Sequence, residues 1–123
     1  MRDEILNIEI RYGDSTEVLI VALHGPLLCQ NLFDFQQTVR SNGARVLIVD
    51  LMNVPYIDSA GVGALVGAYV SYQKDGKQLA LAGVNPRVRS LLAMTQVESF
   101  FRMYDTPGEA QSAITTQRNA AGK

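Results

Sequence analysis

Three short apolar runs constrain the fold of this chain more than any other feature of its sequence. They occupy residues 18–23 (VLIVAL), 46–49 (VLIV) and 78–82 (QLALA), and each is too short to be a complete helix. β-Branched residues dominate the first two runs, which is typical of strands buried on both faces. The run at 46–49 continues into Asp50-Leu51 and is interpreted as the central strand.

Helical patterns alternate with these predicted strands. Apolar side chains recur three and four residues apart within them, and a capping residue, in two cases followed by proline, marks where a helix begins. The first expected helix starts at the Asn31 cap and ends near Ser41, and the second runs from Ser59 to about Lys74. The third starts at Pro86 after Asn85, and the fourth starts at Pro107 after Thr106.

Two further strands complete the expected sheet. Residues 5–12 alternate apolar and polar side chains, as in a half-buried strand, and would form a hairpin with 18–23. Residues 101–104 are expected to be a short edge strand. Alternating strands and helices predict an α/β fold, a single domain with a mixed, mostly parallel sheet of about four or five strands and about four helices.

Length and charge narrow the possible functions. The 123 residues suffice for one domain, expected at 5–116 between an N-terminal extension (1–4) and a flexible tail (117–123). A net charge of −1 argues against direct binding to nucleic acid or to an anionic membrane. Cys29 is the single cysteine, and no apolar run reaches the roughly 20 residues of a membrane span, so the cytoplasm is the expected location.

The start of the second predicted helix concentrates residues suited to a switch. Helix starts carry unpaired backbone N–H groups and the positive end of the helix dipole, which favour a bound phosphate. Phosphorylation of Ser59 at this position would add about −1.5 to −2 charges beside Asp58. The simpler alternative is that Asp58 or Ser59 only caps the helix.

Small residues repeat at intervals of four along this helix. Gly63 and Gly67 form one such pair, and Ala60, Ala64 and Ala68 form another series. Small faces would let the helix backbone approach the sheet closely. We therefore predict that a bulky side chain at Gly63 disrupts packing.

Residues 50–63 read DLMNVPYIDSAGVG after a buried strand. This string resembles the motif D-L-x-x-V-x-[FY]-[IM]-D-[ST]-[ST]-G-[LV]-G of the STAS-domain family, and within it of the SpoIIAA-like anti-sigma factor antagonists. Only Ala60 departs from the defined positions of the motif. The stretch 81–88 (LAGVNPRV) and the order of elements over about 5–116 are also similar to the family.

The resemblance implies a partner-switching protein and not an enzyme. Unphosphorylated family members bind an anti-sigma factor, commonly a serine kinase of the histidine-kinase-like ATPase type, and so release a sigma factor. The kinase modifies the residue after the motif aspartate, here Ser59, which ends binding until a PP2C-type phosphatase restores it. The partner is expected to dock on Asp58, Ser59, Ala60, Gly61 and Val62.

One departure from the family concerns the loop after the second strand. Many antagonists read G-E-L-D there, and the acidic residues help to hold the kinase. This chain reads GPLL at 25–28, so both acidic groups are missing. We expect Leu27 and Leu28 to offer the partner an apolar contact instead.

Catalysis is a weaker interpretation of the same residues. Ser59, His24 and either Asp58 or Asp50 are the residue types of a hydrolase triad, but no G-x-S-x-G motif or oxyanion-hole sequence accompanies them. Cys29 is expected to be a small, partly buried hydrophobe. No cluster of metal-ligand types stands out, so neither metal nor cofactor is expected.

Two binding functions remain as alternatives. The glycines at 61, 63 and 67 miss both the dinucleotide-binding and the P-loop spacing, although a helix start near glycines could hold a phosphate weakly. The same fold could also serve as an unphosphorylated adaptor or scaffold subunit of a sensory complex or transport system. An unmodified Ser59 in cells would favour that adaptor function.

Overall fold

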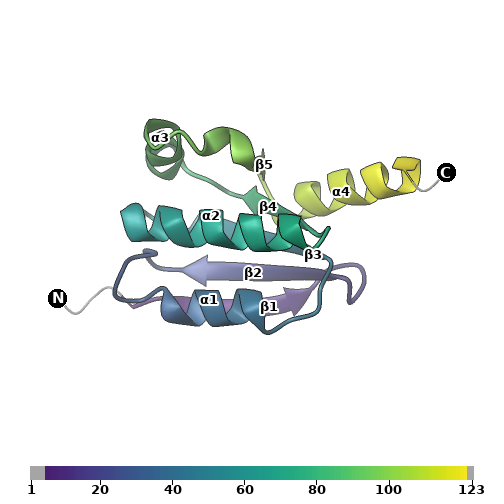
Figure 1. Ribbon diagram of the computed structural model, residues 1–123, viewed down its shortest axis with the longest axis horizontal. Helices are drawn as coiled ribbons and strands as arrows, with labels where there is room; N and C mark the ends of the chain where they lie inside the picture. Colours follow the sequence, from purple (N-terminus) through teal and green to yellow (C-terminus); the bar gives the residue numbers. More distant parts are fainter. Residues whose placement is uncertain (1–4, 122–123) are drawn as a thin grey trace.

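A computed structural model describes residues 5–121 of the chain, with side chains to Ile114. The predicted N-terminal extension and residues 122–123 of the predicted tail lie outside the described residues. The described chain has five strands and four α-helices, and strands and helices alternate after the first two strands (Figure 1). The elements are β1 (Asn7–Tyr12), β2 (Val18–His24), α1 (Phe33–Arg40), β3 (Val46–Asn53), α2 (Ser59–Lys74), β4 (Gln78–Ala82), α3 (Pro86–Met94), the 3-10 turn η1 (Glu98–Phe100), β5 (Arg102–Tyr104) and α4 (Pro107–Ala121).

The sheet has the order β1-β2-β3-β4-β5. Strand β1 is antiparallel to β2, and every later pair is parallel, which confirms the mixed, mostly parallel α/β sheet. The three apolar runs form the three inner strands. Their registers align Leu19 with Leu47 and Leu47 with Leu79, so one continuous row of buried leucines crosses the three inner strands.

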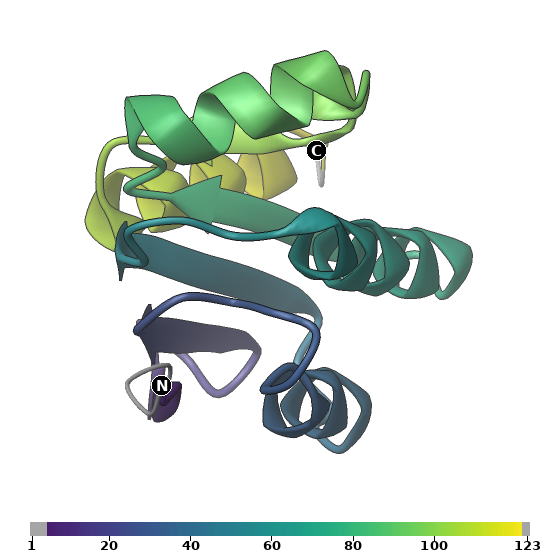
Figure 2. The ribbon, with the colours of Figure 1, turned by 90° about the vertical axis from the view of Figure 1, so that its left-hand side faces the viewer.

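Helices cover both faces of the sheet (Figure 2). Helices α1, α2 and α3 contribute to the larger buried cluster, in which Phe35, Leu65 and Leu92 are fully enclosed. Helix α4 packs on the other face through Ala110 and Ile114. Coverage on both faces explains why the inner strands are continuously apolar and not alternating.

The outermost strand β1 is more exposed than its alternating sequence predicts. Ile8 packs against the larger cluster, but Ile10 is 52% exposed and Tyr12 is 60% exposed. The prediction of half-burial is therefore wrong beyond Ile8. The physical reason is position, because β1 is the outermost strand of the sheet and pairs with β2 alone among the described strands.

Two predicted caps are confirmed and one is wrong. Asn85 accepts a hydrogen bond from the Val88 N–H, and Thr106 accepts one from the Glu109 N–H. Helix α1 instead begins at Phe33 after Leu32, without a side-chain cap. The Asn31 side chain is used in the preceding loop, where it accepts from the Leu28 N–H and donates to the Pro26 carbonyl.

Candidate functional site

The candidate site lies at the carboxyl edge of the parallel strands, where helix α2 begins. Strand β3 ends at Asn53, a loop follows, and α2 starts at Ser59 as predicted. The loop after β2 reaches the same edge, and both loops lie at the left end of the molecule in Figure 1. This position puts the first residues of α2 beside two loops that come from adjacent strands.

Asp58 joins these two loops through its carboxylate. One oxygen, Oδ1, accepts a hydrogen bond of 2.8 Å from the Gly61 N–H and so caps α2. The other, Oδ2, accepts a 3.0 Å hydrogen bond from the Cys29 N–H in the loop after β2. A single side chain therefore satisfies one orphan donor of the helix and fixes the neighbouring loop against it.

The loop after β2 is also held by backbone contacts. Leu27 forms a parallel bridge with Ile57, and the Leu27 carbonyl accepts a 3.3 Å hydrogen bond from the Asp58 N–H. Gly25, at the start of this loop, has a φ of +120°, which residues with a Cβ rarely adopt. The two loops therefore form one ordered surface.

Leu27 and Leu28 lie beneath this surface. Leu27 is fully buried and Leu28 is 6% exposed. The expectation that their side chains offer an apolar contact to a partner is therefore not met in this conformation. Because these leucines anchor the loop in the core, it is the next residues, Cys29 and Gln30, that are exposed, and the expectation that Cys29 is partly buried is wrong.

The motif residues fall into an exposed and a buried group. Ser59 is exposed, and Asp58 and Ala60 are partly exposed. Gly61 and Val62 are buried and support the site from below. A Cβ at Gly61 would overlap the Leu27 carbonyl oxygen, so only glycine permits this approach of helix and loop.

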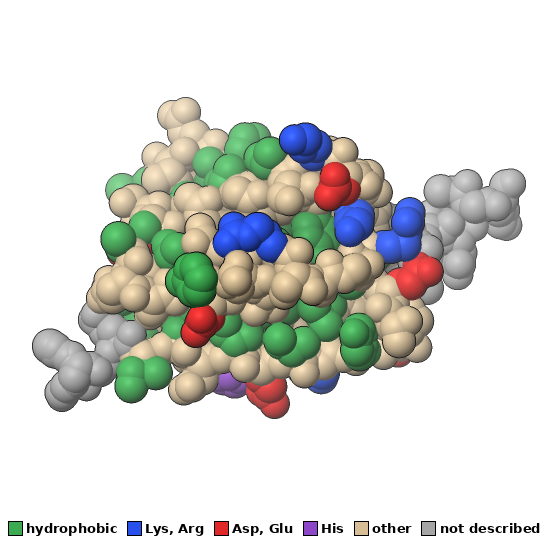
Figure 3. Space-filling model, turned by 60° about the horizontal axis from the view of Figure 1, so that its bottom comes forward, with side chains coloured by type: hydrophobic (Ala, Val, Ile, Leu, Met, Phe, Trp, Pro, Cys, Tyr) green, Lys and Arg blue, Asp and Glu red, His purple; other side chains and the backbone are tan. Residues whose placement is uncertain are grey.

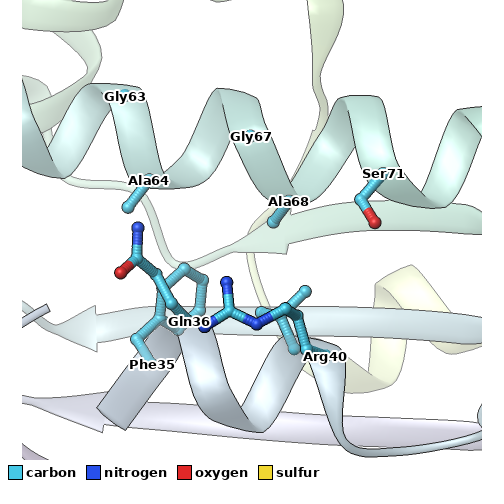
Figure 4. A pocket seen from close by; sticks show the side chains of 9 residues that line it. Phe35, Gln36, Arg40, Gly63, Ala64, Gly67, Ala68 and Ser71 are labelled. Atoms are coloured by element: carbon cyan, nitrogen blue, oxygen red, sulfur yellow. The ribbon is translucent and has the colours of Figure 1, made fainter. Parts of the chain in front are cut away.

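The predicted close-packing role of Gly63 is wrong. A Cβ built at Gly63 or Gly67 would meet no atom within 4 Å, because both positions face outward. They line a cleft of about 180 Å³ between α1 and α2, whose opposite wall includes Gln36 and Arg40 (Figure 4). Ala64 and Ala68 form its buried floor, so the alanine series, and not the glycine pair, faces the interior.

Large apolar side chains are exposed near the ends of the neighbouring helices, and sequence reasoning did not assign them to the site. Phe33 at the start of α1 is 62% exposed, and Met94 at the end of α3 is 77% exposed. The signal available in the sequence was that Phe33 falls off the apolar stripe of its helix. On the face drawn in Figure 3, apolar side chains lie between scattered charges of both signs.

The potential triad residues do not converge. His24 Nε2 lies 3.0 Å from Glu9 Oε1, and His24 Nδ1 lies 3.1 Å from Asn53 Nδ2. Asp50 accepts from the Met52 N–H, and Asp58 binds backbone amides. These contacts place His24 and both carboxylates on partners other than Ser59.

Among residues 5–121, no set of three His, Cys, Asp or Glu side chains is placed to hold a metal ion. Within the same residues, no helix is both long and apolar enough to cross a membrane.

The mixed α/β sheet, the aspartate cap of α2 and the exposed serine at its first position agree with the arrangement expected of a STAS domain. The sequence model of the STAS domain matches residues 7–110, and the chain belongs to this family. The predicted family resemblance is thereby confirmed.

Relatives and solved structures with the same fold bear the name anticipated from the sequence. The anti-sigma F factor antagonist of Paenibacillus polymyxa is 27% identical over 113 residues, which cover 89% of this chain and 97% of that protein. A crystal structure of a putative anti-sigma factor antagonist from Thermotoga maritima superposes with a TM-score of 0.81 at 25% identity, covering 88% of this chain and 94% of the other. Unphosphorylated SpoIIAA has the same fold, with a TM-score of 0.76 at 17% identity over 89% of this chain and 97% of its own.

Proposed function

We propose that this chain is an anti-sigma factor antagonist in which Ser59 is the phosphate-accepting switch. One observation carries the assignment of the switch. Ser59 is exposed at the first position of α2, while Asp58 supplies the cap of that helix. Because the fold does not use Ser59 as its cap, the hydroxyl group is available to a kinase.

The proposed docking surface is the exposed part of the site. Asp58, Ser59 and Ala60 contribute accessible atoms, and Gly61 and Val62 hold them in place from below. Leu27 and Leu28 act through the loop that they anchor, so the partner contacts Cys29 and Gln30 there and not the leucine side chains. The two hydrogen bonds that the Asp58 carboxylate accepts make this surface rigid before binding, which lowers the entropic cost of docking.

Phosphorylation at Ser59 would change the charge of this surface while leaving its shape. A dianion at the start of α2 gains from the helix dipole, so the free phosphorylated protein is well tolerated. A docked partner would have to desolvate that dianion beside the Asp58 carboxylate, which costs several kcal/mol. A loss of about 3–4 kcal/mol lowers the affinity by roughly two to three orders of magnitude.

The names of the relatives support an anti-sigma factor as the partner, and the family resemblance suggests the kinase and the phosphatase that we propose. The unmodified chain would bind an anti-sigma factor, a serine kinase of the histidine-kinase-like ATPase type, and would thereby free a sigma factor. A PP2C-type phosphatase would return the modified chain to the binding form. We place this exchange in the cytoplasm, without direct binding to nucleic acid or membrane.

The deciding experiment is a pull-down from native cells with tagged wild type, Ser59→Ala and Ser59→Asp, followed by mass spectrometry. The proposal expects a kinase-like partner with wild type and Ser59→Ala, its loss with Ser59→Asp, and phosphate on wild-type Ser59. Capture of the same non-kinase protein by all three variants, without phosphate on Ser59, would overturn it. That outcome would assign the chain as a STAS adaptor.

A further inference from the structure

Strand β1 leaves one row of backbone groups unpaired at the edge of the described sheet. Among the described strands it pairs with β2 alone, and it is the outermost strand in Figure 1. In the hairpin, the Gly13 N–H donates to the Val18 carbonyl at 2.8 Å, so Gly13 points toward β2. Alternation along an antiparallel strand then turns the N–H and C=O groups of Ile8, Ile10 and Tyr12 outward.

Of the usual ways to blunt an exposed edge, β1 has charged side chains alone, Glu9 and Arg11. The strand NIEIRY contains no proline and no lysine, and its pairing with β2 has a continuous register without a bulge. Because the two charges have opposite signs, they oppose pairing with a second copy only in registers that bring like charges together, so the edge stays a template for another strand. Ile10 and Tyr12, at 52% and 60% exposed, also leave apolar surface that an added strand would cover.

We propose that β1 is a homodimer interface, in which β1 pairs antiparallel with β1 of a second copy about a two-fold axis at Ile10. The sequence of the strand is complementary to itself about that point. Glu9 lies opposite Arg11 of the second copy, Ile10 faces its own counterpart, and Ile8 faces the second Tyr12. Both charged side chains are exposed, so they can meet across the interface.

The alternative registers are worse for electrostatic reasons. Centring the pair on Glu9 would place two glutamates opposite each other, and centring it on Arg11 would place two arginines opposite each other. Directly opposed like charges destabilise a sheet, while opposed unlike charges stabilise it. The Ile10 centre also makes each outward N–H and C=O of Ile8, Ile10 and Tyr12 meet a partner group.

The pairing would extend the five-stranded sheet across two chains. The proposed interface does not use α2, so each copy would keep its Ser59 site. The inference is thus independent of the switch proposed above. An isologous contact of this type closes on itself and produces a dimer, not a filament.

The test uses charge reversal and sedimentation equilibrium of the purified full chain, up to millimolar concentration. Wild type is expected to dimerise, and Glu9→Arg or Arg11→Glu alone should weaken the dimer about tenfold or more. The double variant should recover the dimer, because it exchanges the two charges. An equimolar mixture of the two single variants should form a heterodimer, since one strand would then carry two arginines and the other two glutamates.

Two further variants separate the interface from effects on the fold. His24→Ala removes the 3.0 Å contact to Glu9 without changing the charge on β1, and should dimerise like wild type. Ile10→Pro removes an outward N–H that β2 does not use, and a proline is tolerated at such a position of an edge strand, so it should abolish dimerisation while circular dichroism stays native. A wild type that is monomeric throughout, or a dimer insensitive to charge reversal and to Ile10→Pro, would overturn the proposal.

Discussion

The backbone of Gly61 lies against the carbonyl oxygen of Leu27 so closely that a Cβ on Gly61 would overlap that oxygen. The contact joins the first turn of α2 to the loop after β2, between segments far apart in the sequence. The same carbonyl accepts a hydrogen bond from the Asp58 N–H, so it cannot move away without losing a bond.

Gly61→Ala should therefore destabilise the protein by about 1–3 kcal/mol, because the methyl group displaces either α2 or the loop. Urea denaturation measures the change in the free energy of unfolding. Gly63→Ala is the matched control, since its Cβ meets no atom within 4 Å and replaces a helix glycine by a better helix former. It should stabilise by about 0.5–1 kcal/mol; equal effects of the two variants would refute the contact argument.

Asp58→Ala should remove the cap of α2 and release the loop together. Loss of the cap alone costs about 0.5–2 kcal/mol. The diagnostic measurement is hydrogen exchange at the Cys29 amide, which should accelerate because its acceptor is Asp58 Oδ2. Asp58→Asn, which keeps an acceptor for the Gly61 N–H, should fall between wild type and Asp58→Ala. An unchanged rate of hydrogen exchange at the Cys29 amide in Asp58→Ala would show that the Asp58 side chain does not hold the loop.

The free energies of unfolding of Ser59→Ala and Ser59→Asp should lie within about 0.5 kcal/mol of the wild-type value, because exposed Ser59 is not the cap of α2. Their affinities for the anti-sigma factor should differ by at least about tenfold, with Ser59→Asp the weaker binder. Isothermal titration calorimetry with the purified partner checks the affinities. Equal affinities would remove Ser59 from the switch.

Alkaline pH should destabilise the fold through Tyr72. Burial raises the pKa of the Tyr72 hydroxyl above its ordinary value of 10.0. The unfolded chain then loses this proton at lower pH than the folded protein, so stability is intact below about pH 10 and declines as the pH rises further. Tyr72→Phe should reduce this alkaline decline, and should cost about 0.5–1.5 kcal/mol at neutral pH through loss of the 3.0 Å hydrogen bond to Asn42. Urea denaturation at several pH values measures both effects; an unaltered alkaline slope would contradict the assignment.

The sheet and helix α2 could be predicted because their signals are local. The apolar runs of β2, β3 and β4 and the Asn85-Pro86 helix start depend on neighbouring residues only. The aspartate-serine motif likewise predicts where α2 begins. What these signals do not contain is how the ends of separate elements meet.

Two of the errors come from contacts between distant segments, and one comes from contacts within a loop. Leu27 is buried because its loop pairs with Ile57, a contact that its own sequence does not encode. Asn31 resembles a helix cap, yet its side chain binds groups within the loop. Gly61 and Gly63 look equivalent in the motif, and only the position of the Leu27 carbonyl separates a required glycine from a replaceable one.

The fact that Asp58, and not Ser59, caps α2 has a consequence for how long the protein survives in a cell. Since Asp58 caps the helix and the dipole of α2 favours a phosphate at Ser59, phosphorylation should not raise the fraction of molecules that are unfolded and open to proteases. The phosphorylated form would then be degraded no faster than the unmodified form. The signal would lie in the share of molecules that carry the phosphate, and the total amount of the protein would not fall as that share rises.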